Sequence, residues 1–190
     1  AIGPVAGSSH HSLFYRMPGI KIISPMTPNE YDYAYKRFMG SEDVFYVSEH
    51  RRSYLNKDEL KNYIHEPADI TLFPFSVTRF DSELARIDLL KMGIKANIIH
   101  QLWIKPIKFG KSEINVLKNS TFGGIVLDDD HVEGIAGDVA HKLMMQSGKK
   151  VYTMGLKPKT AGFHPDVDNL PPTPKEIVKK VLSIIKKNKK

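Results

Sequence analysis

Short apolar runs bounded by turn residues alternate with amphipathic stretches along this chain. Residues 20–24 are apolar and rich in β-branched side chains, and proline or glycine turns flank them, which predicts a buried strand. The next stretch begins with Thr27 as a helix cap and Pro28 in the first turn. A second strand is predicted at 44–48. The first part of the chain is therefore expected to be a strand–helix–strand unit.

A regular alternation of predicted strands and helices begins at Asp69. The predicted strands are 69–76, 95–101, 122–130 and 149–156, and the predicted helices are 81–93, 110–120 and 134–148. Strands that alternate with helices through short loops form parallel sheets, so the expected fold class is α/β, with a mostly parallel sheet flanked by helices. Ligands of such sheets usually bind beyond the carboxyl ends of the strands.

Two details of this pattern concern strand and helix ends. Pro74 removes one ladder hydrogen bond, which predicts that its strand lies at a sheet edge or carries a bulge. Asp81 or Ser82 is the predicted cap of the following helix, and Gly93 is its predicted stop. The charged and polar stretch 49–69 is expected to connect two domains.

The net charge of +7 is concentrated at the carboxyl end. The last 16 residues carry seven lysines and one glutamate, so +6 of the charge lies there. Apolar residues in this segment recur at helical spacing, at Ile177, Val178, Val181, Ile184 and Ile185. This pattern favours a docked helix with a solvated lysine face over binding to nucleic acid or to another acidic surface.

The sequence also limits the compartment and the chemistry. It has no cysteine, which excludes disulfides and thiolate metal sites. It has no apolar run of about 18 residues, and its first residues do not have the pattern of a signal peptide. We therefore expect a cytoplasmic protein, or a matrix protein of mitochondria or plastids in a eukaryote. The chain does not begin with Met, which predicts a processed or cut piece.

Two polar clusters follow predicted strands. Residues 128–137 contain three consecutive aspartates, but their spacing does not match a calcium loop, so we predict a solvated acidic turn and no metal site. Residues 48–54 combine Glu49, His50, Arg51 and Arg52, which predicts ion pairing across a domain or subunit surface. The isolated histidines are expected to be packing or surface residues: His65, His100, His141 and His164.

His10 and His11 are adjacent and precede a short aromatic run. They are compatible with a tag remnant, with an ordered turn in which the imidazoles bond backbone carbonyls, or with proton transfer. Histidine suits proton transfer because its unperturbed pKa lies near neutrality. His10 and His11 are therefore the candidate catalytic residues. No cofactor-binding residue can be assigned from the sequence.

Several stretches, in order, resemble the β subunit of thiamine-diphosphate-dependent 2-oxoacid dehydrogenases of the pyruvate and branched-chain type, in the transketolase superfamily. They are "HHSLFYRMPGIKIISPMTPNE", "VFYVSEHRRSY", "DITLFPFSVTRFDSELARIDLLKMGIKANIIHQLWIKPI", "GGIVLDDDHVEGIAGDVAHKL" and "LPPTPKEIVKKV". The resemblance covers the carboxyl-terminal portion of the family. It implies the second half of a pyrimidine-binding domain at 1–57, a linker at 58–68 and a transketolase carboxyl-terminal-like domain at 69–190. It also implies that His10 or His11 matches the active-site histidine of the family.

The resemblance implies thiamine diphosphate with magnesium, bound at an interface with a partner chain. The first half of the pyrimidine domain, with the cofactor-activating glutamate, and the diphosphate-binding domain are not found in this sequence. We therefore expect a homo- or hetero-oligomer with an α-type subunit, or with the amino-terminal half of the same enzyme. The alternatives are a component of the transketolase or deoxyxylulose-phosphate-synthase type, and a non-catalytic assembly or regulatory module.

Overall fold

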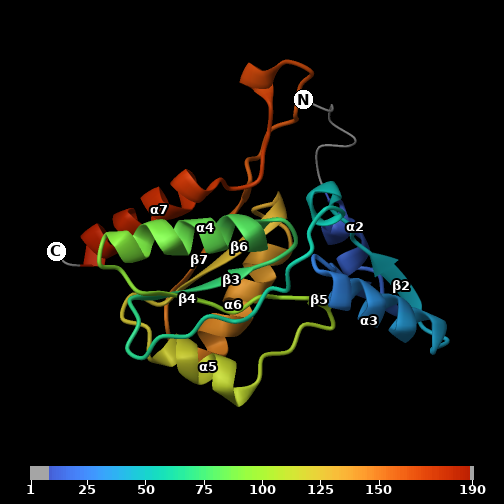
Figure 1. The fold of residues 1–190 in the computed structure, drawn as a ribbon, viewed down its shortest axis with the longest axis horizontal. Helices are drawn as coiled ribbons and strands as arrows, with labels where there is room; N and C mark the ends of the chain where they lie inside the picture. The colour runs from blue at the N-terminus through green and yellow to red at the C-terminus, as the bar shows by residue number, and fades with distance from the viewer. Residues whose placement is uncertain (1–8, 189–190) are drawn as a thin grey trace.

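The computed structural model describes residues 9–188 and contains two β-sheets with helices around them (Figure 1). The smaller sheet has the order β2-β1-β5, and the larger has the order β4-β3-β6-β7. None of the described helices combines the length and apolar character that a membrane span requires.

The smaller sheet is formed by the predicted strand–helix–strand unit and one further strand. β1 (Ile20–Ile23) and β2 (Val44–Val47) are parallel, and α3 (Pro28–Met39) connects them. Thr27 caps α3 by accepting a hydrogen bond from the Glu30 backbone N–H, as predicted. The third strand, β5 (Trp103–Lys105), pairs antiparallel with β1 and was not predicted.

All four strands of the larger sheet are parallel, which confirms the predicted fold class. They are β3 (Ile70–Pro74), β4 (Ala96–Ile98), β6 (Gly124–His131) and β7 (Val151–Leu156). The helices are α4 (Thr78–Lys91), α5 (Lys111–Lys118), α6 (Ile135–Ser147) and α7 (Pro174–Asn188). A short 3-10 helix, η2 (Pro165–Val167), lies in the long crossing before α7.

Hydrophobic residues on both faces of the larger sheet are buried under helices. In Figure 1, α4 and α7 lie on one side of the sheet, and α5 and α6 lie on the other. Ile70 and Leu72 pack in the cluster that includes α4 and α7, whereas Phe73 packs in the cluster that includes α6. This division follows from the alternation of side chains along a strand. The apolar face of α7 is buried, as predicted for the lysine-rich terminal helix.

Two sequence expectations about this sheet were wrong. β3 lies inside the sheet, between β4 and β6, although it contains Pro74. Pro74 is the last residue of β3, where a missing N–H costs little pairing. α4 begins at Thr78 rather than at an Asp81 or Ser82 cap, because the Thr78 hydroxyl donates to the Phe75 carbonyl and supports an earlier start.

Charged pairs join α4 to the first part of the chain. The guanidinium of Arg79, which is almost fully buried, donates two hydrogen bonds of 2.6 and 2.7 Å to the Glu30 carboxylate on α3. Arg52, in the 3-10 helix η1 (Arg51–Ser53), donates to Asp81 at 2.8 Å. The Arg52 pair agrees with the predicted ion pairing of residues 48–54. These bonds fix the unit around the smaller sheet against α4.

A buried histidine–aspartate cluster as the candidate site

Three consecutive carboxylates lie at the carboxyl end of β6, inside the protein. Asp128, Asp129 and Asp130 are 0%, 3% and 4% exposed. The expectation of a solvated acidic turn was therefore wrong. The aspartates remain within the strand. The short helix α2 (His11–Tyr15) and the β3–α4 loop contribute side-chain and backbone groups that bond them.

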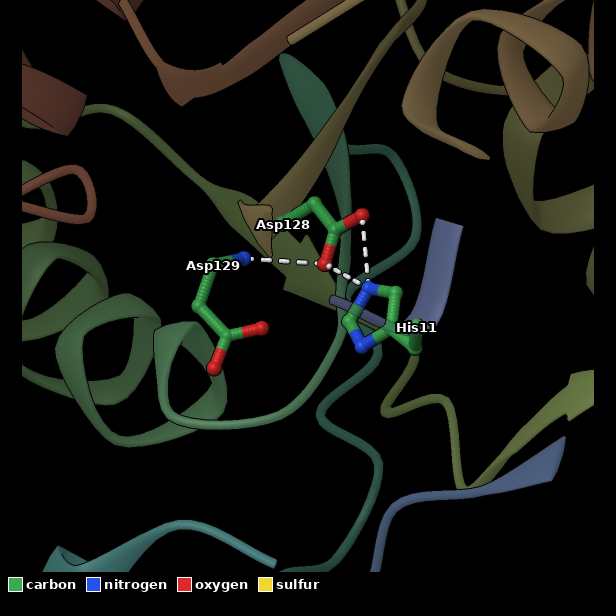
Figure 2. A group of neighbouring side chains, drawn as sticks. All are labelled: His11, Asp128 and Asp129. Atoms are coloured by element: carbon green, nitrogen blue, oxygen red, sulfur yellow. Dashed lines mark hydrogen bonds and ion pairs between the residues drawn. The ribbon is translucent and has the colours of Figure 1, made fainter. Parts of the chain in front are cut away.

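The imidazole of His11 contacts two of these carboxylates. Its Nε2 lies 3.0 and 3.1 Å from the two Asp128 oxygens, as Figure 2 shows, and 3.9 Å from an oxygen of Asp130. Its Nδ1 lies 3.4 Å from the Ser48 hydroxyl. The side chain of His11 is fully buried. His11 therefore connects the start of the described chain to β6, 117 residues away.

The other two carboxylates have different environments. One Asp129 oxygen accepts a 2.6 Å hydrogen bond from Ser76, and the other has no partner in the described part of the chain. Ser76 has a φ of 46°, a left-handed conformation that few non-glycine residues adopt. Asp130 accepts from the backbone N–H groups of Ser12 at 3.0 Å and His131 at 2.7 Å. Backbone N–H groups therefore stabilise the charge of Asp130, whereas Asp129 accepts no such backbone hydrogen bond in the described structure.

Ser12 holds α2 against the first turn of α6. Its hydroxyl accepts a 3.2 Å hydrogen bond from the Ile135 N–H. A Cβ at Gly134 would lie 2.3 Å from the Ser12 oxygen, so glycine is required there for this close approach. Phe14 stacks on Tyr46 of β2 at a centroid distance of 4.4 Å. α2 is thus packed between the two sheets, which places His11 against the aspartates.

The buried charges shift the pKa values of this cluster. Burial by itself lowers the pKa of His11, but the charge and hydrogen bond of Asp128, with Asp129 and Asp130 nearby, raise it to about 9. Burial raises the pKa of Asp129 to about 6, against the attraction of His11. Burial opposes ionisation of Asp130, yet its bond from Ser12 and the charge of His11 lower its pKa. His11 is therefore an imidazolium at neutral pH.

The stability of the protein is expected to fall between about pH 6.5 and about pH 9. The pKa of His11 is raised on folding, so its contribution is complete below 6.5 and is lost as the pH rises through about 9. The shift corresponds to up to about 3 kcal/mol. Urea denaturation at several pH values measures this. In the His11→Asn variant, the free energy of unfolding should fall much less over this pH range. An equal fall in that variant would show that His11 is not its cause.

The same residues include a set of possible metal ligands. Donor atoms of His11, Asp128 and Asp129 lie within 4.8 Å of one another. However, a protonated imidazole has no lone pair to give to a metal, and Nε2 is engaged by Asp128. In this arrangement the imidazolium itself supplies the positive charge that the aspartates require.

The structure separates the two predicted histidines. His11 is buried in the ion pair, whereas His10 is partly exposed and precedes α2 with a φ of 58°. Sequence reasoning placed Ser76 in a candidate site region and Ser48 in a polar cluster, but it gave neither residue a role in the site. Their positions just after β2 and β3, at the carboxyl ends of parallel strands, were the available signal.

Comparison with known proteins identifies the fold but not a family. No family model and no curated protein matches the chain in sequence. A split-gene transketolase in an inactive β4 tetramer matches with a TM-score of 0.69 and 16% identity, over 92% of this chain and 60% of that chain. A Pichia stipitis transketolase in complex with sedoheptulose-7-phosphate matches with a TM-score of 0.70 and 17% identity, over 98% and 28%.

A transketolase from Campylobacter jejuni gives a similar result, with a TM-score of 0.68 and 16% identity over 95% of this chain and 29% of that chain. The chain thus spans less than two thirds of the split-gene protein and less than a third of the other two. The identities are too low to carry an activity across. The described residues have the α/β fold of the carboxyl-terminal part of transketolases, with a mostly parallel sheet flanked by helices.

Proposed function

We propose that this chain is a component of a thiamine-diphosphate-dependent enzyme that acts together with other polypeptide segments. The observation that carries the proposal is the transketolase fold, present over 98% of this chain and only 28% of a transketolase. We assign the residue ranges 1–57, 58–68 and 69–190 to the second half of a pyrimidine-binding domain, a linker and a carboxyl-terminal domain. The larger sheet, whose four strands all come from 69–190, supports the last range, while β5 of that range also joins the smaller sheet of the first.

The preferred reaction is decarboxylation of a 2-oxo acid with acyl transfer to a lipoyl carrier. It rests on the sequence resemblance to the β subunit of 2-oxoacid dehydrogenases. A sugar-processing reaction of the transketolase or deoxyxylulose-phosphate-synthase type is the second candidate. The solved transketolases described above share this fold, and this observation favours the second candidate.

The candidate site does not fit thiamine diphosphate by itself. Asp128, Asp129 and Asp130 would repel a diphosphate, and His11, which could attract one, is already paired. The carboxylates are also closed off from solvent. We therefore propose that other segments, from the same or another polypeptide, supply the groups that bind the cofactor and magnesium.

Exposed apolar residues around the smaller sheet support a requirement for a partner. β2 is an edge strand, and Val44 on it is 62% exposed. On α3, Phe38 and Met39 are 42% and 79% exposed. An open strand edge beside apolar side chains is a typical place for another chain or domain to pack. An α-type subunit, or the amino-terminal half of the same enzyme, fits this position.

The proposal predicts that cofactor binding depends on the partner. Isothermal titration of thiamine diphosphate with magnesium into the chain alone should give no saturable binding. The same titration with candidate α-type subunits or amino-terminal halves should give binding. Lack of binding to every such mixture would contradict the proposal and favour a non-catalytic assembly module.

The reaction is tested on the mixture that binds the cofactor. Turnover of 2-oxo acids with a lipoyl acceptor would support the dehydrogenase component. Turnover of ketose phosphates alone would support the transketolase type and contradict the preferred reaction.

A further inference from the structure

A cavity of about 430 Å³ lies away from the histidine–aspartate cluster, where α3 and β1 meet the segment between β4 and α5. Lys21 comes from β1, and Tyr33 and Arg37 come from α3. His100 and Trp103 come from the connecting segment, which enters the smaller sheet as β5. Because this segment runs from β4 of the larger sheet to β5 of the smaller sheet, the cavity has walls from both parts of the protein.

Positive charge predominates in the lining of this cavity. Lys21, Arg37 and Lys108 are set against one carboxylate, Glu113. Glu113 accepts a 2.7 Å hydrogen bond from the Gly110 N–H and serves as part of a helix cap. Lys21 pairs with Asp43, but within residues 9–188 neither Arg37 nor Lys108 forms an ion pair. Asp43 also attracts Arg37, and the lining still has more positive than negative groups, which favours an anionic ligand.

Aromatic rings form another part of the wall. Trp103 and Tyr33 meet edge to face, with a centroid distance of 6.3 Å and an interplanar angle of 90°. Trp103 is only partly buried, so part of its ring remains available for contact. Rings of this kind provide apolar area on which a planar group can pack. An anion and a planar ring in one molecule would use both features of the lining.

His100 lines the same wall. Its Nε2 lies 3.0 Å from Glu83, and burial lowers the pKa of this imidazole. In the neutral form, Nε2–H donates to Glu83 and Nδ1 is an acceptor. Nδ1 is buried and has no partner in the described structure. This nitrogen is closed off from solvent, so it offers no contact to a ligand of the cavity.

We propose that this cavity binds a small phosphorylated ligand with a planar ring, of the nucleoside monophosphate class. Arg37 and Lys108 bind the phosphate, and the ring packs against Trp103. The volume is within the range of known small-ligand sites. The cavity shares none of its described lining residues with the histidine–aspartate cluster, so this proposal is independent of the proposed function.

Calorimetric titration of the full chain with AMP tests the proposal. AMP should bind saturably, while adenosine and inorganic phosphate should each bind much more weakly. Arg37→Gln should weaken AMP binding by at least about tenfold, because it removes a charged donor to the phosphate. Lys36→Gln is the matched control on the same helix. Lys36 lies outside the cavity lining, is exposed and pairs with Asp32, so this variant should bind AMP as the parent chain does.

The position of the ligand can be read from the indole N–H signal of Trp103 in NMR spectra, since this is the only tryptophan. The signal should shift with AMP. Absence of AMP binding would overturn the proposal. Equal binding of phosphate alone would overturn the role of the ring, and AMP binding that is equally weakened by Arg37→Gln and Lys36→Gln would overturn the assigned phosphate contact.

Discussion

Replacing His11 by alanine is expected to lower the free energy of unfolding by about 3–5 kcal/mol. The substitution removes the imidazolium that lies 3.0 Å from Asp128, in a pair whose two side chains are both fully buried. The Asp128 carboxylate then remains buried beside Asp129 and Asp130 without a positive partner. A buried charge that loses its partner costs far more than a surface pair does, because water cannot replace the lost interaction.

Urea denaturation near pH 6, where the His11 contribution is complete, gives this change directly. His164→Ala is the matched control. His164 also lies close to an aspartate, Asp166 at 3.3 Å, but both side chains are more than 70% exposed. His164→Ala should change the free energy of unfolding by no more than about 0.5 kcal/mol. The double variant His11→Ala/Asp128→Asn should be more stable than His11→Ala, because it has no unpaired Asp128 charge. A loss below about 1 kcal/mol in His11→Ala would contradict the buried ion pair.

Replacing His10 by alanine is expected to lower turnover of the cofactor-binding complex by about 10²- to 10⁴-fold, the range of a lost proton-transfer group. This expectation rests on the proposed function. The resemblance assigns the proton-transfer role to His10 or His11, and the burial of His11 against Asp128 leaves His10 as the histidine with access to a substrate. His10 is also held at the start of α2 in a left-handed conformation, which fixes its backbone.

A catalytic role for His10 predicts a loss of rate without a matching loss of stability. The urea denaturation of His10→Ala should stay close to that of the parent chain. His164→Ala should retain full turnover. If His10→Ala keeps normal turnover, or if it loses turnover only in proportion to its stability, the proton-transfer role is wrong.

These two variants distinguish two roles for adjacent residues. His11 is expected to act on stability, and through the placement of α2 on the geometry of the site. His10 is expected to act on the reaction. The sequence treats the two histidines alike, since each is an imidazole next to the same aromatic run. The distinction arises because α2 directs the side chain of His11 toward β6.

Much of the fold was predictable from local patterns. The strand at 20–24, the cap at Thr27 and the parallel arrangement of the larger sheet all appeared as expected. The burial of Asp128 to Asp130 was not predictable, because three consecutive acidic residues are usually solvated. Their burial depends on His11, Ser12 and Ser76, which belong to segments distant from β6 in the sequence.

β5 shows the same limit for secondary structure. Trp103 to Lys105 is too short to stand out as a strand, and its hydrogen bonds are made to β1, about 80 residues earlier. The cavity beside it is defined by that crossing, and the sequence contains no motif for it. The place of β3 in the sheet was likewise predicted incorrectly, because the neighbouring strands β4 and β6 decide it. The start of α4 was predicted too late, because a hydrogen bond from Thr78 to the Phe75 carbonyl supports an earlier start.

The sequence by itself determined the α/β class, the order of the main strands and helices, and the docking face of α7. Each of these follows from the spacing of apolar side chains, which depends only on the repeat of the strand or helix that carries them. The tertiary structure alone decided that His11 is an ion-pair residue, that the three aspartates are buried, and that cations and aromatic rings share one cavity. The role of a charged or polar group depends on the segments that surround it after folding. Before the chain packs, water satisfies such a group, so the sequence alone does not reveal its partner.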